Sequence, residues 1–193
     1  MEFIFLFFTY FLTSIPFGYV IGLFFGKDVT KEGSGNIGAT NVARTIGKKA
    51  GLFVLFLDLL KGFIPVYLAK LYGFSDKFVA VIAILAVVGH CFSVFLKFKG
   101  GKGVATGIGV LFALSPKVAL IVMLFWLGVF LTTGYVSLAS ILSAFISWII
   151  FMYVDGNIYY TTAAFISSVI IVFKHTSNIE RFLSGTENRF IYK

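Results

Sequence analysis

Long apolar segments follow one another along this chain of 193 residues, and they decide what it can fold into. Each is about as long as the roughly 20 residues that an α-helix needs to cross the hydrocarbon core of a membrane. Hydrophobic residues make up 59% of the chain and charged residues only 12%, which leaves too few polar side chains to cover a water-soluble protein of this size. We therefore expect an all-α, polytopic integral membrane protein.

A proline interrupts the apolar stretch between Val104 and Thr133. Pro116 has no backbone N–H and pushes the residue before it out of the helical region, so two short helices are expected here. Together the apolar segments of the chain are expected to form a single membrane-embedded domain over 1–193 with about seven transmembrane helices. The fourth helix is too short to cross unless it is tilted or sheltered by protein. The predicted helices cover residues 2–25, 50–72, 77–96, 103–115, 117–133, 137–154 and 158–174.

The distribution of Lys and Arg predicts the orientation, because cytoplasmic loops of membrane proteins collect basic residues. With the N-terminus outside, the regions 26–49, 97–102 and 133–136 and the C-terminal tail lie in the cytoplasm. Twelve of the 16 basic residues then fall on that side. Without the break at Pro116 the basic tail would face outwards, so the charge distribution favours seven helices and a cytoplasmic C-terminus.

The first polar segment is EGSGNIGATNVAR, residues 32–44, which lies between two strongly apolar runs. Its hydroxyl and amide side chains can donate hydrogen bonds, its glycines permit tight backbone turns, and an arginine suits bidentate recognition of phosphate. A solvated loop of turn-forming residues is the alternative. The candidate ligand-binding residues are Ser34, Gly35, Asn36, Thr40, Asn41 and Arg44.

The second polar segment is KFKGGKGVATG, residues 97–107, in which glycines surround a lysine where a helix is expected to begin. Backbone N–H groups and the positive end of a helix dipole together form a cradle for anions. The spacing is not that of a P-loop nucleotide site, so we predict a phosphate-binding turn, with a basic loop touching anionic lipid as the alternative. The candidates are Lys99, Gly100, Gly101, Lys102, Gly103 and Thr106.

The third polar segment, KHTSNIERFLSGTENR, directly follows the last predicted span. His175 can bind phosphate or accept a proton, and Asn178 follows it by three residues. An amphipathic helix lying on the lipid surface is the alternative. With the predicted topology all three polar segments lie on the cytoplasmic side, which indicates a single site for anions.

Two polar groups lie within predicted spans. Asp58 and Lys61 are costly alone in hydrocarbon, and we expect them to pair with each other or to face the site. Ser137 and Ser140, one turn apart at the start of the sixth helix, are candidate hydroxyl donors, with Ser140 assigned to the site, although small residues also serve helix contacts. His90 lies in an apolar run and is expected to be a buried, satisfied histidine. Scattered acids, two distant histidines and a single Cys91 predict no metal site and no cofactor.

The segments SGNIGATNVAR, GGKGVATG and HTSNIERFLSGTE resemble the three signature segments of the bacterial membrane acyl-phosphate:glycerol-3-phosphate acyltransferases, the PlsY family. The resemblance covers essentially the whole chain, with small departures such as Phe182 in place of leucine. It implies transfer of a fatty acyl group from acyl phosphate to the 1-hydroxyl of glycerol 3-phosphate, giving lysophosphatidic acid and phosphate. It also implies a location in the bacterial cytoplasmic (inner) membrane, with the active site facing the cytoplasm.

The resemblance also implies roles and partners. Ser34, Arg44, Lys102, His175 and Asn178 become the catalytic residues, whereas Glu187 is implied to be structural. The implied partners are the two substrates, membrane lipid and the soluble phosphate acyltransferase that makes acyl phosphate, and no nucleic acid is expected. A small transporter of phosphate esters is the alternative function, although no internal repeat supports it. Whether the histidine or a substrate phosphate takes the proton stays open, as does the choice of Lys99 or Lys102 as the principal contact.

Overall fold

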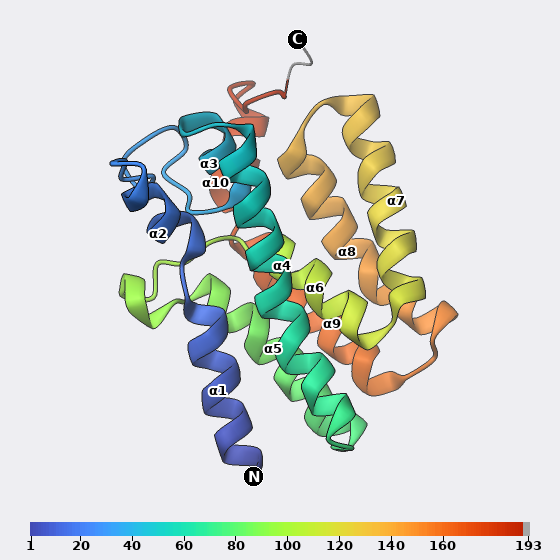
Figure 1. Cartoon of the computed structure of the whole chain (residues 1–193). Coiled ribbons are helices and arrows are strands. Elements are labelled where there is room, and N and C mark those ends of the chain that lie inside the picture. The colour runs from blue at the N-terminus through green and yellow to red at the C-terminus, as the bar shows by residue number, and fades with distance from the viewer. Residues whose placement is uncertain (191–193) are drawn as a thin grey trace.

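The protein is an assembly of helices in the computed structural model, which describes residues 1–190 (Figure 1). Within these residues there is no β-strand. A 3-10 helix, η1 (Val94–Leu96), follows the fifth α-helix. The α-helices are α1 (Glu2–Ser14), α2 (Phe17–Phe24), α3 (Ala39–Thr45), α4 (Lys48–Leu71), α5 (Asp76–Cys91), α6 (Val104–Leu114), α7 (Pro116–Thr133), α8 (Val136–Val154), α9 (Ile158–Phe173) and α10 (Thr176–Leu183).

The first predicted helix, over 2–25, is wrong as a single element. It is divided into α1 and α2, whose axes differ by 42°. Pro16 cannot donate a backbone hydrogen bond and disfavours the helical conformation at the residue before it, which ends α1 at this point. The Ile15 carbonyl instead accepts a hydrogen bond from the Lys61 ammonium at 2.7 Å. The kink is therefore held by a side chain of another helix.

The predicted break at Ser115-Pro116 is confirmed, and it separates α6 from α7. With 11 residues α6 is shorter than a membrane span, and it packs among α4, α5, α7 and α9 (Figure 1). Its last carbonyl groups are satisfied from within the protein, because Lys70 Nζ donates to the Ala113 and Leu114 oxygens at 3.0 and 2.9 Å. A short helix can end in an apolar interior only when such donors are present.

Glycines allow α4 and α6 to approach each other closely. A Cβ atom added at Gly62 would lie 2.2 Å from the Thr106 carbonyl oxygen, and one added at Gly109 would lie 2.0 Å from the Leu59 carbonyl oxygen. Small residues at helix crossings are a common packing device in membranes, where close backbone contact replaces the hydrophobic effect. These two glycines therefore bring the start of α6 against the middle of α4.

The outer surface of the bundle is strongly apolar. Phe3, Phe24 and Leu124 are 78, 85 and 69% exposed, as expected for side chains that face lipid. Among residues 1–190, four helices are long and apolar enough to cross a membrane, and up to six spans result if each bent helix pair counts as one. The chain is a multi-pass membrane protein. The count of seven crossings and the outside position of the N-terminus stay predictions.

The first and third polar segments lie at one end of the bundle. Figure 1 shows α3 and the C-terminal tail at the end opposite the N-terminus, while the turn between α8 and α9 lies near the N-terminal end. α3 and α10 are short helices at this end. A helix within the first polar segment was not expected from the sequence. The third segment forms a short helix, as its amphipathic alternative predicts, and its polar side chains Asn178 and Arg181 have partners within the protein; its position on a lipid surface stays a prediction.

Candidate active site

The second polar segment wraps around the end of α5 and presents Lys102. The Gly100 N–H donates to the Cys91 carbonyl at 3.2 Å, and the Gly101 N–H donates to the His90 carbonyl at 3.1 Å. Gly103 then begins α6 in the left-handed conformation, with a φ of 84° that favours glycine. Because this loop is fixed against α5, the half-buried lysine has a defined position at the start of α6.

A chain of hydrogen bonds connects Lys102 to the third segment. The Lys102 ammonium donates to Asn178 Oδ1, and Asn178 Nδ2 donates to Glu187 Oε1 at 2.6 Å. The same carboxylate accepts from Ser137 Oγ at 2.7 Å and from Arg181 Nε at 2.8 Å. Glu187 thus holds α8, α10 and the C-terminal tail together behind the lysine.

Positive charge dominates this place. Burial lowers the pKa of Lys102 to about 8, and the neighbouring cations Arg181, Arg44 and Lys174 act in the same direction. Arg44 belongs to the first polar segment, and its charge acts on Lys102 of the second. The first segment therefore borders the same site as the other two. Partial burial would raise the pKa of Glu187, but the hydrogen bonds that it accepts keep that pKa below its usual value. One carboxylate among four cations leaves a net attraction for anions.

His175 is buried between α9 and α10, as the residue that precedes α10. Its Nδ1 lies 2.7 Å from the Ile171 carbonyl oxygen, to which it can only donate. Burial lowers the pKa of the His175 imidazole to about 4, and the positive charge of Lys102 acts in the same direction. The ring is therefore neutral near pH 7, with its lone pair on Nε2.

Asn41 organises the first segment. Its amide nitrogen donates to the carbonyls of Val29, Glu32 and Asn36, and its Oδ1 accepts from the Ser34 N–H at 2.8 Å. The side chain is buried and fully used within the loop. We therefore assign it to the scaffold that shapes the loop, rather than to direct contact with phosphate.

The loop that this scaffold shapes presents the remaining candidates of the first segment. Asn36 Oδ1 accepts from the Gly38 N–H at 2.8 Å, so this side chain also shapes the loop. Gly35 has a left-handed φ of 69°. Ser34 and Arg44 are exposed and Thr40 is half-buried, so these three side chains are accessible to a ligand.

Three other candidates differ in their burial and their contacts. Thr106 is fully buried, and its hydroxyl lies 3.0 Å from His90 Nδ1. The Ser140 hydroxyl donates to the Val136 carbonyl at 2.7 Å and accepts from Trp126 Nε1 at 3.1 Å. Lys99 is exposed. The first two side chains therefore serve contacts between helices.

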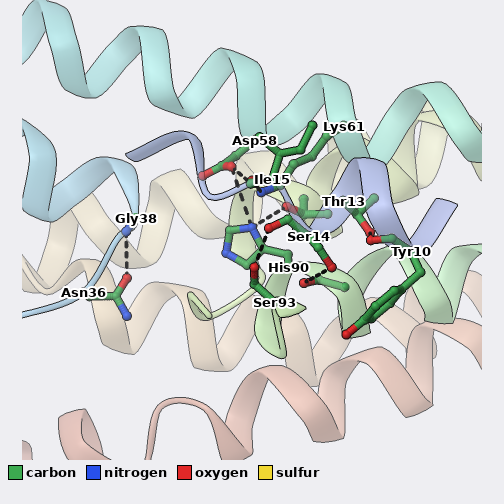
Figure 2. A network of polar contacts seen from close by, with 12 residues as sticks. Tyr10, Thr13, Ser14, Ile15, Asn36, Gly38, Asp58, Lys61, His90 and Ser93 are labelled. Atoms are coloured by element: carbon green, nitrogen blue, oxygen red, sulfur yellow. Dashed lines mark hydrogen bonds and ion pairs between the residues drawn. The ribbon is translucent and has the colours of Figure 1, made fainter. Parts of the chain in front are cut away.

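The expected pairing of Asp58 with Lys61 is confirmed, with 2.8 Å between Oδ1 and Nζ, and both side chains are buried. The expectation of a buried, bonded His90 is confirmed as well. Figure 2 shows the ion pair from α4 above the His90 ring of α5, next to the end of α1. This buried cluster is a neighbour of the glycine loop and not part of the cationic site.

Neither Arg181 nor Lys174 was placed in the site from the sequence, and of the two candidate serines Ser140 was assigned to it and not Ser137. Arg181 follows Asn178 by three residues and so lies on the same face of α10, a spacing visible in the sequence. Lys174 directly precedes His175. Ser137 lies one helical turn before Ser140, so the sequence could not decide which of the two serines faces the site.

An apolar cavity of about 40 Å³ lies between α6, α7, α8 and α9. Its wall begins at Val104 and Ile171, which neighbour Lys102 and His175 in the sequence, and continues to Leu114 and Ala164. The cationic site therefore adjoins the apolar side chains of the bundle interior.

Known proteins that resemble this chain resolve the class of site. The glycerol-3-phosphate acyltransferase family matches residues 3–185. The glycerol-3-phosphate acyltransferase of Aquifex aeolicus (strain VF5) is 50% identical over 187 residues, covering 95% of this chain and 96% of the relative. The enzyme of the same name from Fusobacterium nucleatum is 43% identical, covering 97% of each. The chain belongs to the glycerol-3-phosphate acyltransferase family.

Solved structures of the family extend this finding. Crystal structures of PlsY (YgiH), an integral membrane glycerol 3-phosphate acyltransferase, are 46% identical to this chain. The glycerol 3-phosphate form superposes with a TM-score of 0.94 and covers 98% of this chain and 96% of that one. The lysophosphatidic acid form superposes with a TM-score of 0.90. The protein is therefore a membrane acyltransferase enzyme, which favours catalysis over the transporter alternative.

Proposed function

We propose that this protein transfers a fatty acyl group from acyl phosphate to the 1-hydroxyl of glycerol 3-phosphate, giving lysophosphatidic acid and inorganic phosphate. The names of its relatives support glycerol 3-phosphate as the acceptor, and the ligand forms of the PlsY structures support both acceptor and product. The reaction takes place at the cytoplasmic face of the bacterial inner membrane. This location is supported by the basic residues that surround the site.

The observation that carries the proposal is the contact between Lys102 and Asn178, surrounded by further cations. Both substrates carry a phosphate, and two anions repel each other unless positive charge lies between or around them. Lys102 and the N-terminal end of α6 hold the phosphate of glycerol 3-phosphate, and Arg44 and Ser34 at the rim hold that of the acyl donor.

The chemistry asks mainly for positioning. In the reaction the 1-hydroxyl oxygen attacks the acyl carbonyl carbon, the bond from that carbon to the phosphate oxygen breaks, and phosphate leaves with the bonding electrons. Because an acyl phosphate already has a good leaving group, holding the two substrates together and stabilising the oxyanion supply most of the acceleration.

The proton of the hydroxyl passes to a phosphate oxygen of the donor. His175 Nε2 accepts a hydrogen bond from the hydroxyl and orients it. A base with a pKa of about 4 is poorly matched to proton abstraction near neutral pH, which supports this division of roles.

The donor reaches the site from the cytoplasm or the inner leaflet. A soluble phosphate acyltransferase that makes acyl phosphate is the proposed supplier, and membrane lipid surrounds the remaining faces. No cofactor is required, since the acyl phosphate is itself activated.

The direct test is phosphate release by the purified protein in detergent or lipid nanodiscs. Acyl phosphate should yield phosphate and lysophosphatidic acid only when glycerol 3-phosphate is added. Lys102→Met should lose this activity, whereas Lys117→Met, which removes an exposed lysine near the opposite end, should keep it. Release of phosphate without the acceptor, or equal activity of both variants, would contradict the proposal.

A further inference from the structure

A buried polar cluster lies directly behind the glycine loop. Asp58, Lys61 and His90 are 2, 2 and 4% exposed, and none of them belongs to the cationic site. Buried charges are costly in a membrane protein and are seldom kept without a purpose. The contacts of this cluster lead in two directions, to the kink after α1 and to the loop that carries Lys102.

One side of the cluster holds α1 against α4 and α5. Lys61 Nζ lies 2.8 Å from Asp58 Oδ1 and donates to the Ile15 carbonyl at 2.7 Å. Near this kink the Ser93 hydroxyl donates to the Ser14 carbonyl at 2.5 Å, and the Ser14 hydroxyl donates to the Gly89 carbonyl at 3.3 Å (Figure 2). The end of α5 is therefore fixed by polar contacts on its α1 side.

The other side of the cluster supports the loop. His90 Nδ1 lies 3.0 Å from Thr106 Oγ1, within hydrogen-bond distance, and 3.7 Å from Asp58 Oδ1, so α6 supplies the hydrogen bond to the ring and α4 places a carboxylate beside it. Its Nε2 lies directly against the loop, because a Cβ atom added at Gly101 would be only 2.2 Å from that nitrogen. The imidazole thus supports the loop from below, one residue before Lys102.

From these contacts we infer that the Asp58–His90–Thr106 network positions the anion-binding loop. The hydrogen bond with Thr106 fixes the rotation of the imidazole, and the Asp58 carboxylate lies beside the ring. The imidazole in turn fixes Gly101, and the loop then directs Lys102 toward Asn178. His90 is a positioning residue, since it lies beneath the loop and does not reach the ligand side. The positioning of the loop does not depend on the proposed function. Only the expected change in the KM for glycerol 3-phosphate rests on it.

The sharpest test uses Thr106→Val, which removes the hydroxyl and keeps the shape of the side chain. Loss of one buried hydrogen bond should speed amide hydrogen exchange at Gly100 and Gly101 about fivefold. The KM for glycerol 3-phosphate should rise by a similar factor, about fivefold, while kcat changes less than twofold. Thr106→Ser should restore both, and Thr161→Val, a buried threonine of α9, should change neither.

The outcomes separate this inference from the proposed function. Normal exchange together with a raised KM would overturn positioning, because Thr106 would then act on the substrate directly. Exchange and KM both within twofold of the wild type would also overturn it. Faster exchange with an unchanged KM would support the network and count against the assignment of this loop to glycerol 3-phosphate.

A pair of His90 variants gives a second test that does not depend on Thr106. Asparagine places a polar atom near the position of Nδ1, whereas leucine of similar size places none. His90→Asn should keep the KM within about threefold of the wild type, and His90→Leu should raise it about tenfold. If either variant fails to fold, the double variant Asp58→Asn/Lys61→Met, which removes both charges at once, should speed loop exchange in the same way. Unchanged exchange in the double variant would overturn the inference.

Discussion

Lys102 is a half-buried cation among other cations, and this has a measurable consequence. With its pKa lowered to about 8, chiefly by burial, the free enzyme loses this charge within an accessible pH range. We expect kcat/KM for glycerol 3-phosphate to fall about tenfold between pH 7 and pH 9, because one unit above the pKa only about a tenth of the ammonium remains. Lys102→Arg should flatten this profile, since guanidinium stays charged.

The same pKa shift distinguishes the expected loss of activity at high pH from a loss of activity caused by unfolding. Lys102 has its usual pKa of 10.5 in the unfolded chain and about 8 in the folded protein, so between these values the unfolded chain binds more protons. This group therefore makes the folded state more stable as the pH rises through that window. If Tm fell over the same pH range as kcat/KM, unfolding would explain the loss of activity. That result, or a kcat/KM that stays constant up to pH 10, would contradict the role of the Lys102 charge in substrate binding.

His175 gives a second prediction at the scale of one residue. A neutral ring that orients the hydroxyl should matter less than a general base, whose removal typically costs 10²- to 10⁴-fold. We expect His175→Ala to lower kcat by only about tenfold and to raise the KM for glycerol 3-phosphate. A fall of more than about a thousandfold in kcat with an unchanged KM would instead identify the ring as the base.

The sequence was sufficient to predict many of the residues that form this site. It was not sufficient to predict the direction in which each side chain points. Lys102 and Asn178 stand out in the sequence because charged and amide groups follow glycines and the end of a span. Thr106 stands only four residues from Lys102, yet on α6 it faces His90 and not the ligand side. That difference depends on the close crossing of α4 and α6, which no local pattern contains.

At the scale of elements, Gly62 determines how closely α6 approaches α4. In Gly62→Ala the new methyl group would meet the Thr106 carbonyl, a backbone atom that cannot rotate away, so the two helices must separate. We expect a loss of about 1–3 kcal/mol in stability, seen as a lower Tm in detergent. Gly128→Ala in α7 is the matched control, because no atom lies within 4 Å of its Cβ position and alanine favours the helix. Equal Tm values for the two variants would contradict this account of the crossing.

Helix boundaries illustrate what sequence can and cannot provide. Both Pro116 and Pro16 end a helix, yet only the break at Pro116 was expected, since the run over 2–25 already had the length of one span. The bend between α1 and α2 is maintained by Lys61, 46 residues away from Ile15. A contact at that separation is set by tertiary packing, so the hydropathy of the first run could not indicate it.

At the scale of the whole molecule, the proposed function requires the site to face the cytoplasm. The tail after α10 and the turn between α8 and α9 lie at opposite ends of the bundle, and the basic residues favour the tail as the inner end (Figure 1). Accessibility of single cysteines can test this directly. The only native thiol, Cys91, is buried and so gives little background.

Two exposed positions serve this test, Asp155 between α8 and α9 and Ser184 after α10. A membrane-impermeant maleimide should label Asp155→Cys in intact spheroplasts and Ser184→Cys only after lysis. Both variants should remain active, which shows that the labelled molecules are folded. Labelling of Ser184→Cys in intact spheroplasts would place Lys102 and its anion site outside. A phosphorylated metabolite of the cytoplasm could then not reach the enzyme, so a reversed pattern would remove the physical basis of the proposed reaction together with the orientation.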